Sequence, residues 1–241
     1  MNEDKQMKME AVILAGGQGS RLKPYTAEIP KPLVPVGDKP IVEILIKSLR
    51  KAGVSKLHLC VNHLAHLIIG LLGDGARYGL EIEYSHEDAP LSTVGPLKLI
   101  KSLPDDFLVV NGDVLTDIDY RALYESHLES KALATVATCR RQHPVDYGIL
   151  KTAADNSVIG FQEKPVLDYT VSMGVYVFSR KLLECVPDNT KFGFDDLMLT
   201  LLKRKASVRS YPYNGYWLDI GRVEDYEQAN RDISLIEKLF D

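Results

Sequence analysis

The stretch AVILAGGQGSRL, residues 11–22, decides the fold of this 241-residue chain. Apolar residues at 11–15 predict a short buried strand, and glycines follow at Gly16, Gly17 and Gly19. Because glycine has no Cβ atom and tolerates unusual φ values, the amides of such a loop can approach a phosphate closely. An ordinary glycine-rich turn would use the same residues, so the loop alone leaves both interpretations open.

Strand and helix signals alternate through the first half of the chain. Strands are predicted at residues 11–15, 56–61, 80–85 and 107–111, and helices at 41–52, 65–72, 96–102 and 120–130. Alternation of this kind implies βαβ units and a mainly parallel sheet. We therefore predict an α/β fold with three layers around a mainly parallel, twisted sheet.

Strand signals predominate after residue 132. Strands are predicted at 133–140, 148–151, 158–163 and 171–178, and helices at 180–186, 195–203 and 223–239. We interpret this part as a second lobe fused to the same sheet. The predicted organisation is a polar tail at residues 1–9 followed by one domain at 10–241, with no internal repeat.

Composition excludes several classes of protein. A net charge of −4 argues against a broad surface for nucleic-acid backbones. The three cysteines are far apart and include no CxxC pair, so neither a disulfide framework nor a zinc ribbon is indicated. The first ten residues lack an apolar signal core, and no apolar run approaches about 18 residues. We expect a cytoplasmic protein with neither nucleic acid nor a membrane as partner.

Three named glycine motifs do not fit the loop. The P-loop string GxxxxGK[ST] is absent, and the dinucleotide pattern GxGxxG fails because Leu22 stands where its last glycine would be. Kinase motifs are absent too.

The residues after the loop are more informative. Arg21 lies two positions after Gly19, and the segment PKPLVPV holds Lys31 between two prolines, which stiffen the chain. Two cations near a glycine loop suit a polyphosphate.

The segment LAGGQGSRLKPYTAEIPKPLVPVGDKPIVE, residues 14–43, resembles the signature of sugar-1-phosphate nucleotidylyltransferases, the nucleotide-sugar pyrophosphorylases. The resemblance covers roughly residues 11–233. Its other motifs are EDAPLSTVGPL (87–97), VVNGDVL (109–115), FQEKP (161–165), SMGVYVF (172–178) and WLDIGRVEDY (217–226). The segment YSHEDAPLSTVGPL is most similar to the mannose- and heptose-1-phosphate guanylyltransferase branch.

The resemblance implies a reaction in which an NTP and a sugar 1-phosphate give an NDP-sugar and pyrophosphate. It implies a dinucleotide-binding-like domain, with a nucleotide-binding half at about 10–115, a sugar-binding lobe at about 116–215 and a closing motif and helix at about 216–241. No C-terminal β-helix of hexapeptide repeats is expected, so any homo-oligomer should form through the catalytic domain.

The resemblance also assigns roles to residues. Arg21, Lys31, Asp113 and Asp219 are the expected catalytic residues, and the two aspartates are expected to hold Mg²⁺, which takes few protein carboxylates. The NTP is expected to contact Leu14, Gly16, Gly17, Gly19, Ser20, Arg21, Lys31, Glu87, Thr93 and Gly95. The sugar phosphate is expected to contact Gly112, Gly148, Glu163, Lys164 and Gly174.

Glu87 favours guanine, because a carboxylate only accepts hydrogen bonds and guanine offers two adjacent donors. Residues 72–85 also resemble short uridylyltransferases, so a uridylyl- or thymidylyltransferase remains an alternative. A non-catalytic nucleotide-sugar sensor and a glycosyltransferase that uses Asp117 and Asp119 are further alternatives. Ser92 departs from the family pattern, which has glycine there, and it would be costly if the position needs a positive φ.

Overall fold

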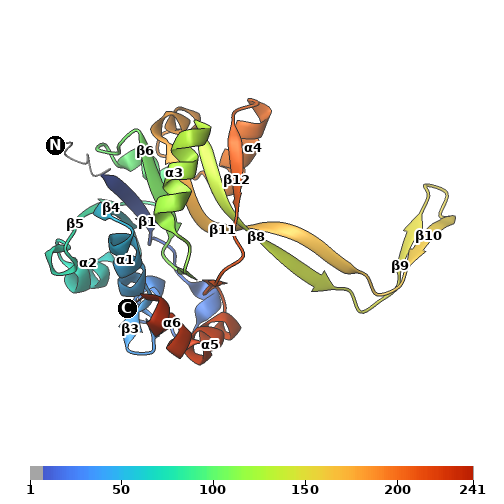
Figure 1. Ribbon diagram of the computed structural model, residues 1–241, viewed down its shortest axis with the longest axis horizontal. Coiled ribbons are helices and arrows are strands. Elements are labelled where there is room, and N and C mark those ends of the chain that lie inside the picture. The colour runs from blue at the N-terminus through green and yellow to red at the C-terminus, as the bar shows by residue number, and fades with distance from the viewer. Residues whose placement is uncertain (1–7, 241) are drawn as a thin grey trace, which may run out of the picture.

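One seven-stranded sheet organises the computed structural model, which describes residues 8–240 (Figure 1). The strand order is β12-β8-β11-β6-β1-β4-β5, and β6, β1, β4 and β5 are parallel. The antiparallel strand β11 joins this half to β8 and β12. The strands are β1 (Met9–Leu14), β4 (Val54–Val61), β5 (Glu81–His86), β6 (Asp106–Asn111), β8 (Ala134–Pro144), β11 (Val166–Ser179) and β12 (Val208–Pro212).

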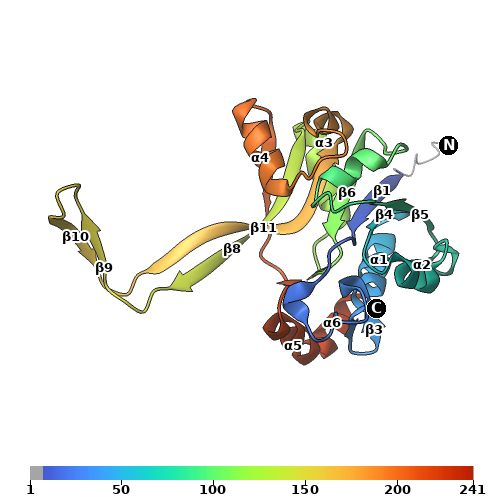
Figure 2. The same ribbon diagram turned by 180° about the vertical axis from the view of Figure 1, so that it is seen from behind.

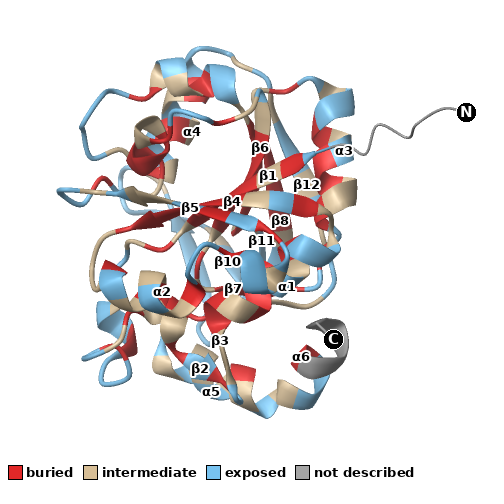
Figure 3. Ribbon diagram, turned by 90° about the vertical axis from the view of Figure 1, so that its left-hand side faces the viewer, coloured by how far each residue is buried: buried red, intermediate tan, exposed pale blue. Residues whose placement is uncertain are grey.

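Helices cover both faces of the sheet, which confirms the three-layer α/β prediction. On one face, α1, α2 and α3 pack against side chains such as Ile13 and Leu59. On the other face, α4 and two 3₁₀ helices pack against Val12 and Phe107. Figure 3 shows the buried residues concentrated along the strands between these layers. The helices are α1 (Ile41–Lys51), α2 (Ala65–Leu72), α3 (Tyr120–Ser130), α4 (Phe194–Lys203), η4 (Gly95–Leu99) and η5 (Arg180–Cys185).

Short elements tie distant parts of the chain together. The antiparallel pair β7–β13 joins the segment after β6 to the segment before the C-terminal helices. The remaining elements are β2 (Pro35–Val36), β3 (Lys39–Pro40), β7 (Val114–Thr116), β9 (Ile149–Thr152), β10 (Val158–Gln162), β13 (Trp217–Asp219), η1 (Ser20–Leu22), η2 (Lys31–Leu33), η3 (Ala76–Tyr78), α5 (Val223–Arg231) and α6 (Ile233–Phe240). Within residues 8–240, the helices are too short or too polar to span a bilayer.

Three predicted helices differ from the structure. The helix expected at 180–186 is the 3₁₀ helix η5, in which the Arg180 amide donates to the Asp105 carbonyl at 2.7 Å and the Val186 amide donates to the Leu183 carbonyl, three residues before it, at 3.1 Å. The helix expected at 96–102 is the 3₁₀ helix η4, because the amides of Val94 and Gly95 are bonded to the Phe192 carbonyl and fix the preceding turn. The single helix expected at 223–239 is broken at Asp232. The Asp232 carboxylate accepts hydrogen bonds from the Tyr216 hydroxyl at 3.2 Å and from the Gln228 amide at 2.8 Å, which places the break between α5 and α6.

The strands β8 and β11 are longer than the sequence predicted, because both continue beyond the sheet as a two-stranded ribbon. Residues 140–170, which we call the arm, contain the outer parts of these strands and the hairpin β9–β10. Figures 1 and 2 show the arm extending away from the rest of the protein, which we call the body. Side chains of β8 and β11 are buried inside the body and exposed along the ribbon.

Candidate active site

The carboxyl ends of β1 and β6 place the glycine loop beside the Asn111–Asp113 segment. Leu14 is in register with Asn111, and the Gly112 amide donates to the Leu14 carbonyl at 3.0 Å. A Cβ atom on Gly112 would lie only 2.8 Å from that carbonyl oxygen, so the two backbones require glycine here. Ligand sites of open α/β sheets lie at this edge of the strands.

Asp113 is held by Lys31. The Lys31 ammonium forms an ion pair with Oδ2 of Asp113, so the two predicted residues meet although 82 positions separate them. The other carboxylate oxygen, Oδ1, is buried without a hydrogen-bond partner in the described chain, as is Oδ1 of Asn111. Two buried, unpartnered oxygen acceptors, separated in sequence only by Gly112, indicate a place for a cation or a hydroxyl group.

Asp219 is brought to Asp113 by the β7–β13 pair. The Ile220 amide donates to the Asp113 carbonyl at 3.0 Å, and Asp219 pairs with Val114 in the ladder. Burial raises the pKa of Asp219, the charge of Asp113 raises it further, and Lys31 lowers it. Two neighbouring carboxylates of this kind offer oxygen donors to a divalent cation.

The oxygen donors fit Mg²⁺, which completes its shell with water and phosphate. No group of three or more histidine, cysteine, aspartate or glutamate side chains suited to a metal occurs among residues 8–240. A dedicated protein cage is therefore not built in this part of the chain. The two aspartates match the smaller number of protein ligands that Mg²⁺ uses in phosphate sites.

Arg21 reaches the same place from the glycine loop. A Cβ atom on Gly221 would lie 3.4 Å from the Arg21 guanidinium and 3.6 Å from Oδ1 of Asp219, so both groups flank this glycine. Gly19 has φ +61°, and a Cβ atom there would lie 3.1 Å from Cβ of Lys31. The predicted residues Arg21, Lys31, Asp113 and Asp219 are thus gathered around one point. Ser20 begins η1 and is exposed.

A cleft of about 450 Å³ begins at Asp113 and extends over the glycine loop. Six of the predicted residues line it: Leu14, Gly16, Gly17, Glu87, Thr93 and Asp113. The other lining residues are Gln18, Cys60, Asn62, Pro90, Ser92, Pro96 and Asn111. Of these, only Ser92 was discussed from the sequence as a single residue. Gln18, Pro90, Pro96 and Asn111 fall within the quoted motifs but were not predicted as site residues, and Cys60 and Asn62 belong to no quoted motif.

Glu87 lies between the glycine loop and the loop at residues 88–95. Its Oε2 accepts from the Leu91 amide at 2.9 Å, and a Cβ atom on Gly16 would lie 2.5 Å from its Oε1. Burial raises the pKa of Glu87, while the Leu91 amide lowers it. One carboxylate oxygen is therefore used to brace the loop, and the other is directed at Gly16.

The rest of this loop is fixed by the segment before α4. Oγ1 of Thr93 accepts from the Phe194 amide at 2.9 Å. A Cβ atom on Gly95 would lie 2.9 Å from the Thr190 carbonyl, so Gly95 serves close packing and is not among the residues lining the cleft. Ser92 has φ +67°, which is the positive φ that the sequence identified as costly for serine.

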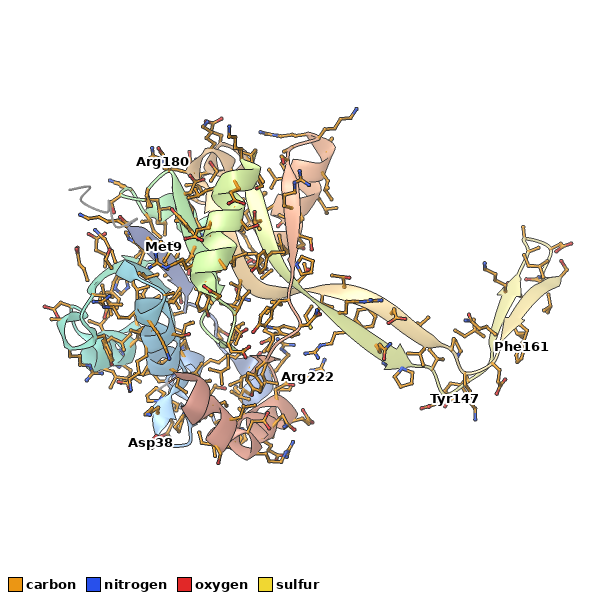
Figure 4. All side chains as sticks on the ribbon, in the orientation of Figure 1. Met9, Asp38, Tyr147, Phe161, Arg180 and Arg222 are labelled. Carbon is orange, nitrogen blue, oxygen red and sulfur yellow. The ribbon has the colours of Figure 1, made fainter. Side chains whose placement is uncertain are left out.

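Predicted sugar-phosphate residues lie in two places. Gly174 has φ +72°. A Cβ atom on Gly174 would lie 2.6 Å from Nδ2 of Asn111, so the two residues are in close contact. Gly148, Glu163 and Lys164 belong to the arm, in which Figure 4 marks the base of the hairpin β9–β10 with Tyr147 and Phe161. A Cβ atom on Gly148 would lie 3.2 Å from Oε2 of Glu163, so these residues are near one another. The structure does not bring them to Asp113 of the same chain.

The nucleotidyl transferase family model matches residues 10–235. The chain belongs to the nucleotidyl transferase family. A relative described as D-glycero-alpha-D-manno-heptose 1-phosphate guanylyltransferase, from Aneurinibacillus thermoaerophilus, is 32% identical over 93% of this chain and 98% of its own length. UTP--glucose-1-phosphate uridylyltransferase from Synechocystis sp. is 33% identical over 93% of this chain and 63% of its own length. The chain therefore spans less than two thirds of that relative, as it does of the yeast mannose-1-phosphate guanyltransferases it matches.

Solved structures agree with this assignment. HddC from Yersinia pseudotuberculosis is 30% identical with a TM-score of 0.72, and the match covers 93% of this chain and 99% of that one. A second structure of HddC, described as complexed with GMP-PN, has a TM-score of 0.71 at 29% identity and covers 93% of this chain and 99% of that one.

Two features of this nucleotidyl transferase have no signal in the sequence. The Arg141 guanidinium lies over the Trp217 ring, 4.7 Å from its centroid, where the arm leaves the body. Trp217 in turn donates from Nε1 to the Met173 carbonyl at 2.9 Å. These contacts connect the base of the arm to the motif that holds Asp219. The adjacent Arg140 and Arg141 do not by themselves indicate from the sequence that Arg141 stacks on a tryptophan ring.

Proposed function

We propose that this nucleotidyl transferase transfers a nucleoside monophosphate from an NTP, with GTP preferred, to a sugar 1-phosphate, giving an NDP-sugar and pyrophosphate in the cytoplasm. The observation that carries the proposal is the group formed by Lys31, Asp113, Asp219 and Arg21 beside the glycine loop. The reaction joins two anions, so it needs cations and amide donors more than a general base.

The chain's own residues would share this work. The glycine-loop amides would hold the NTP phosphates, and Arg21 would stabilise the charge that develops on the departing pyrophosphate. Lys31 would lie near the α- and β-phosphates. Asp113 and Asp219 would hold Mg²⁺, which supplies charge neutralisation to the phosphates when bound.

The preference for GTP has two supports. Relatives that this chain resembles are described as guanylyltransferases for mannose 1-phosphate and for a heptose 1-phosphate, so these sugars are the first candidates for the acceptor. Glu87 lines the cleft and has one carboxylate oxygen free of the Leu91 amide. The similar Synechocystis uridylyltransferase makes UTP the main competing nucleotide.

Pyrophosphate release, measured with Mg²⁺ for each NTP against a panel of hexose, aminosugar and heptose 1-phosphates, tests the reaction. GTP with mannose or heptose 1-phosphate should give the highest kcat/KM, and Glu87→Gln should reduce the GTP preference. Selectivity for UTP or dTTP would refute the assignment of guanine as the nucleobase, while the proposed nucleotidyl transfer reaction would stand. Nucleotide-sugar binding without release by a folded wild-type protein would instead identify a sensor.

Asp113→Asn and Asp219→Asn test the metal site. Each should lower the rate of pyrophosphate release by about 100-fold or more, the scale of losing a group that stabilises transition-state charge. Circular dichroism should show that both variants remain folded. Near-wild-type rates in both variants would overturn the metal assignment.

Gly17→Ala separates phosphate binding from folding. No atom lies within 4 Å of a Cβ atom at Gly17, so the substitution should change the free energy of unfolding by less than about 0.5 kcal/mol. It should weaken NTP binding by about tenfold, equivalent to roughly 1.4 kcal/mol, because the methyl group enters the space for the phosphates. Gly70→Ala is the control, since Gly70 in α2 also has open space around it and lies outside the cleft. Equal NTP affinities in the two variants would contradict the loop's assignment.

A further inference from the structure

The arm exposes a large apolar surface. Of the fourteen large hydrophobic residues that are exposed in the described part of the chain, nine belong to it: Tyr147, Ile149, Leu150, Val158, Ile159, Phe161, Val166, Leu167 and Tyr169. The hairpin β9–β10 pairs with no third strand among the described residues, and such a hairpin is at best marginally stable alone in water. An apolar surface of this size marks an interaction site.

The ribbon holds the outer arm away from its own cleft. Pairing between β8 and β11 is continuous from Ser172 opposite Thr138 to Val166 opposite Pro144. At about 3.3 Å per residue, this part of the ribbon spans roughly 20 Å. The register shift in this pairing lies at the base, between Ser172 and Tyr176. Glu163 and Lys164 follow beyond the outer end, so one lysine side chain cannot bridge the gap to Asp113.

The sugar phosphate needs a cation beyond those that the body would use for the NTP. Among the described residues that line the cleft there is no lysine or arginine. Of the two cations beside it, Lys31 is paired with Asp113, and Arg21 is assigned above to the departing pyrophosphate. A sugar 1-phosphate carries about 1.5–2 negative charges near pH 7, as phosphate monoesters do. It would enter beside two carboxylates. The exposed Lys164, with Glu163 next to it to accept sugar hydroxyl groups, has the chemistry of the missing acceptor site.

We propose that two copies of the chain exchange arms, and that Glu163 and Lys164 of one copy bind the sugar phosphate at the cleft of the other. This inference rests on the proposed function. A second copy is the partner because it meets both needs: it covers the apolar arm, and it presents a cleft with no cation left for the sugar phosphate. The strand β11 returns from the arm to the edge of the cleft, where Gly174 lies against Asn111. Two bodies related by a two-fold axis can therefore each receive the other's arm, and reciprocal exchange of this kind is a low-cost route to a dimer.

Complementation between two inactive variants tests the exchange. Asp113→Asn disables the body and leaves the arm intact, whereas Lys164→Ala disables the exposed arm residue and leaves the body intact. Coexpressed in equal amounts, they should recover about one quarter of the wild-type activity, because half of the dimers are mixed and each mixed dimer has one site with both intact parts. The double variant Asp113→Asn/Lys164→Ala, coexpressed with Lys164→Ala, is the control and should recover none.

An active wild type, inactive single variants and no recovery on coexpression would show that each arm serves its own body, and would overturn the exchange. An active Lys164→Ala protein would overturn it as well. An inert wild type would instead count against the proposed function. In that case, the mass of the wild-type protein in solution tests whether two copies of the chain associate through their arms.

Sedimentation velocity supplies this measurement. The wild type should be a dimer, and Phe161→Glu should convert it to a monomer by placing a charge on the apolar arm. Leu199→Glu is the matched control, because Leu199 is equally exposed but lies on α4 of the body, with 69% exposure against 64% for Phe161. It should remain a dimer. A monomeric wild type, or a dimer that Phe161→Glu leaves intact, would overturn the proposal.

Discussion

Ser92→Gly should stabilise the protein, which is unusual for a glycine substitution. Ser92 has φ +67°, and the left-handed conformation costs a residue with a Cβ atom about 1–2 kcal/mol. Glycine removes this cost but loses about 0.5–1 kcal/mol through the greater freedom of the unfolded chain. The net gain in the free energy of unfolding is about 0.5–1 kcal/mol. For a domain of this size, that corresponds to a rise in Tm of roughly 1–4 °C.

Ser55→Gly is the matched control for this prediction. Ser55 is exposed on β4 and is not among the residues with positive φ, so the same substitution should destabilise the protein by about 0.5–1 kcal/mol. Urea denaturation of both variants, with the m value checked for constancy, measures the two changes. The two substitutions should change the free energy of unfolding in opposite directions. A loss of stability in Ser92→Gly equal to that in Ser55→Gly would refute the left-handed conformation at residue 92.

Two further predictions concern the body. Gly112→Ala should lower the free energy of unfolding by about 1–3 kcal/mol, because its Cβ atom would lie 2.8 Å from the Leu14 carbonyl; unchanged thermal stability would contradict this contact. His127 is buried, which lowers its pKa although Asp106 raises it. The unfolded chain therefore binds more protons than the native chain just below pH 6.5, and stability should fall as pH falls from 6.5 through the lower pKa of the folded state. His127→Gln should reduce this pH dependence in urea titrations at several pH values, whereas His66→Gln at an exposed histidine should retain it.

Elements with local signals could be predicted from the sequence. The helix Ile41–Lys51 and the strand Asp106–Asn111 were predicted to within one residue at each end, because their apolar patterns and following glycines are local features. The break at Asp232 was not predicted, since it depends on the Tyr216 hydroxyl, which comes from another segment.

The candidate site was likewise predicted only in part, because some of its contacts depend on segments that are distant in the sequence. Lys31 and Asp113 were both expected among the catalytic residues, but the sequence shows neither their ion pair nor that a carboxylate oxygen of Glu87 is used by Leu91. The projection of the arm was also missed. Strand-like segments predict strands at 133–140 and 171–178, yet they do not show where a ribbon leaves its sheet, because burial changes along β8 and β11 while the strands continue.

Trp217 is the single tryptophan of the chain, and its surroundings make it an intrinsic optical probe. Its ring lies beneath the Arg141 guanidinium, its Nε1 is bonded to the backbone at the base of the arm, and Asp219 follows two residues later. Its emission should therefore respond to changes at both the base of the arm and the candidate active site. A titration with nucleotide or Mg²⁺ can be followed by fluorescence in the unlabelled protein, and the rate of any change in arm position can be timed by stopped flow.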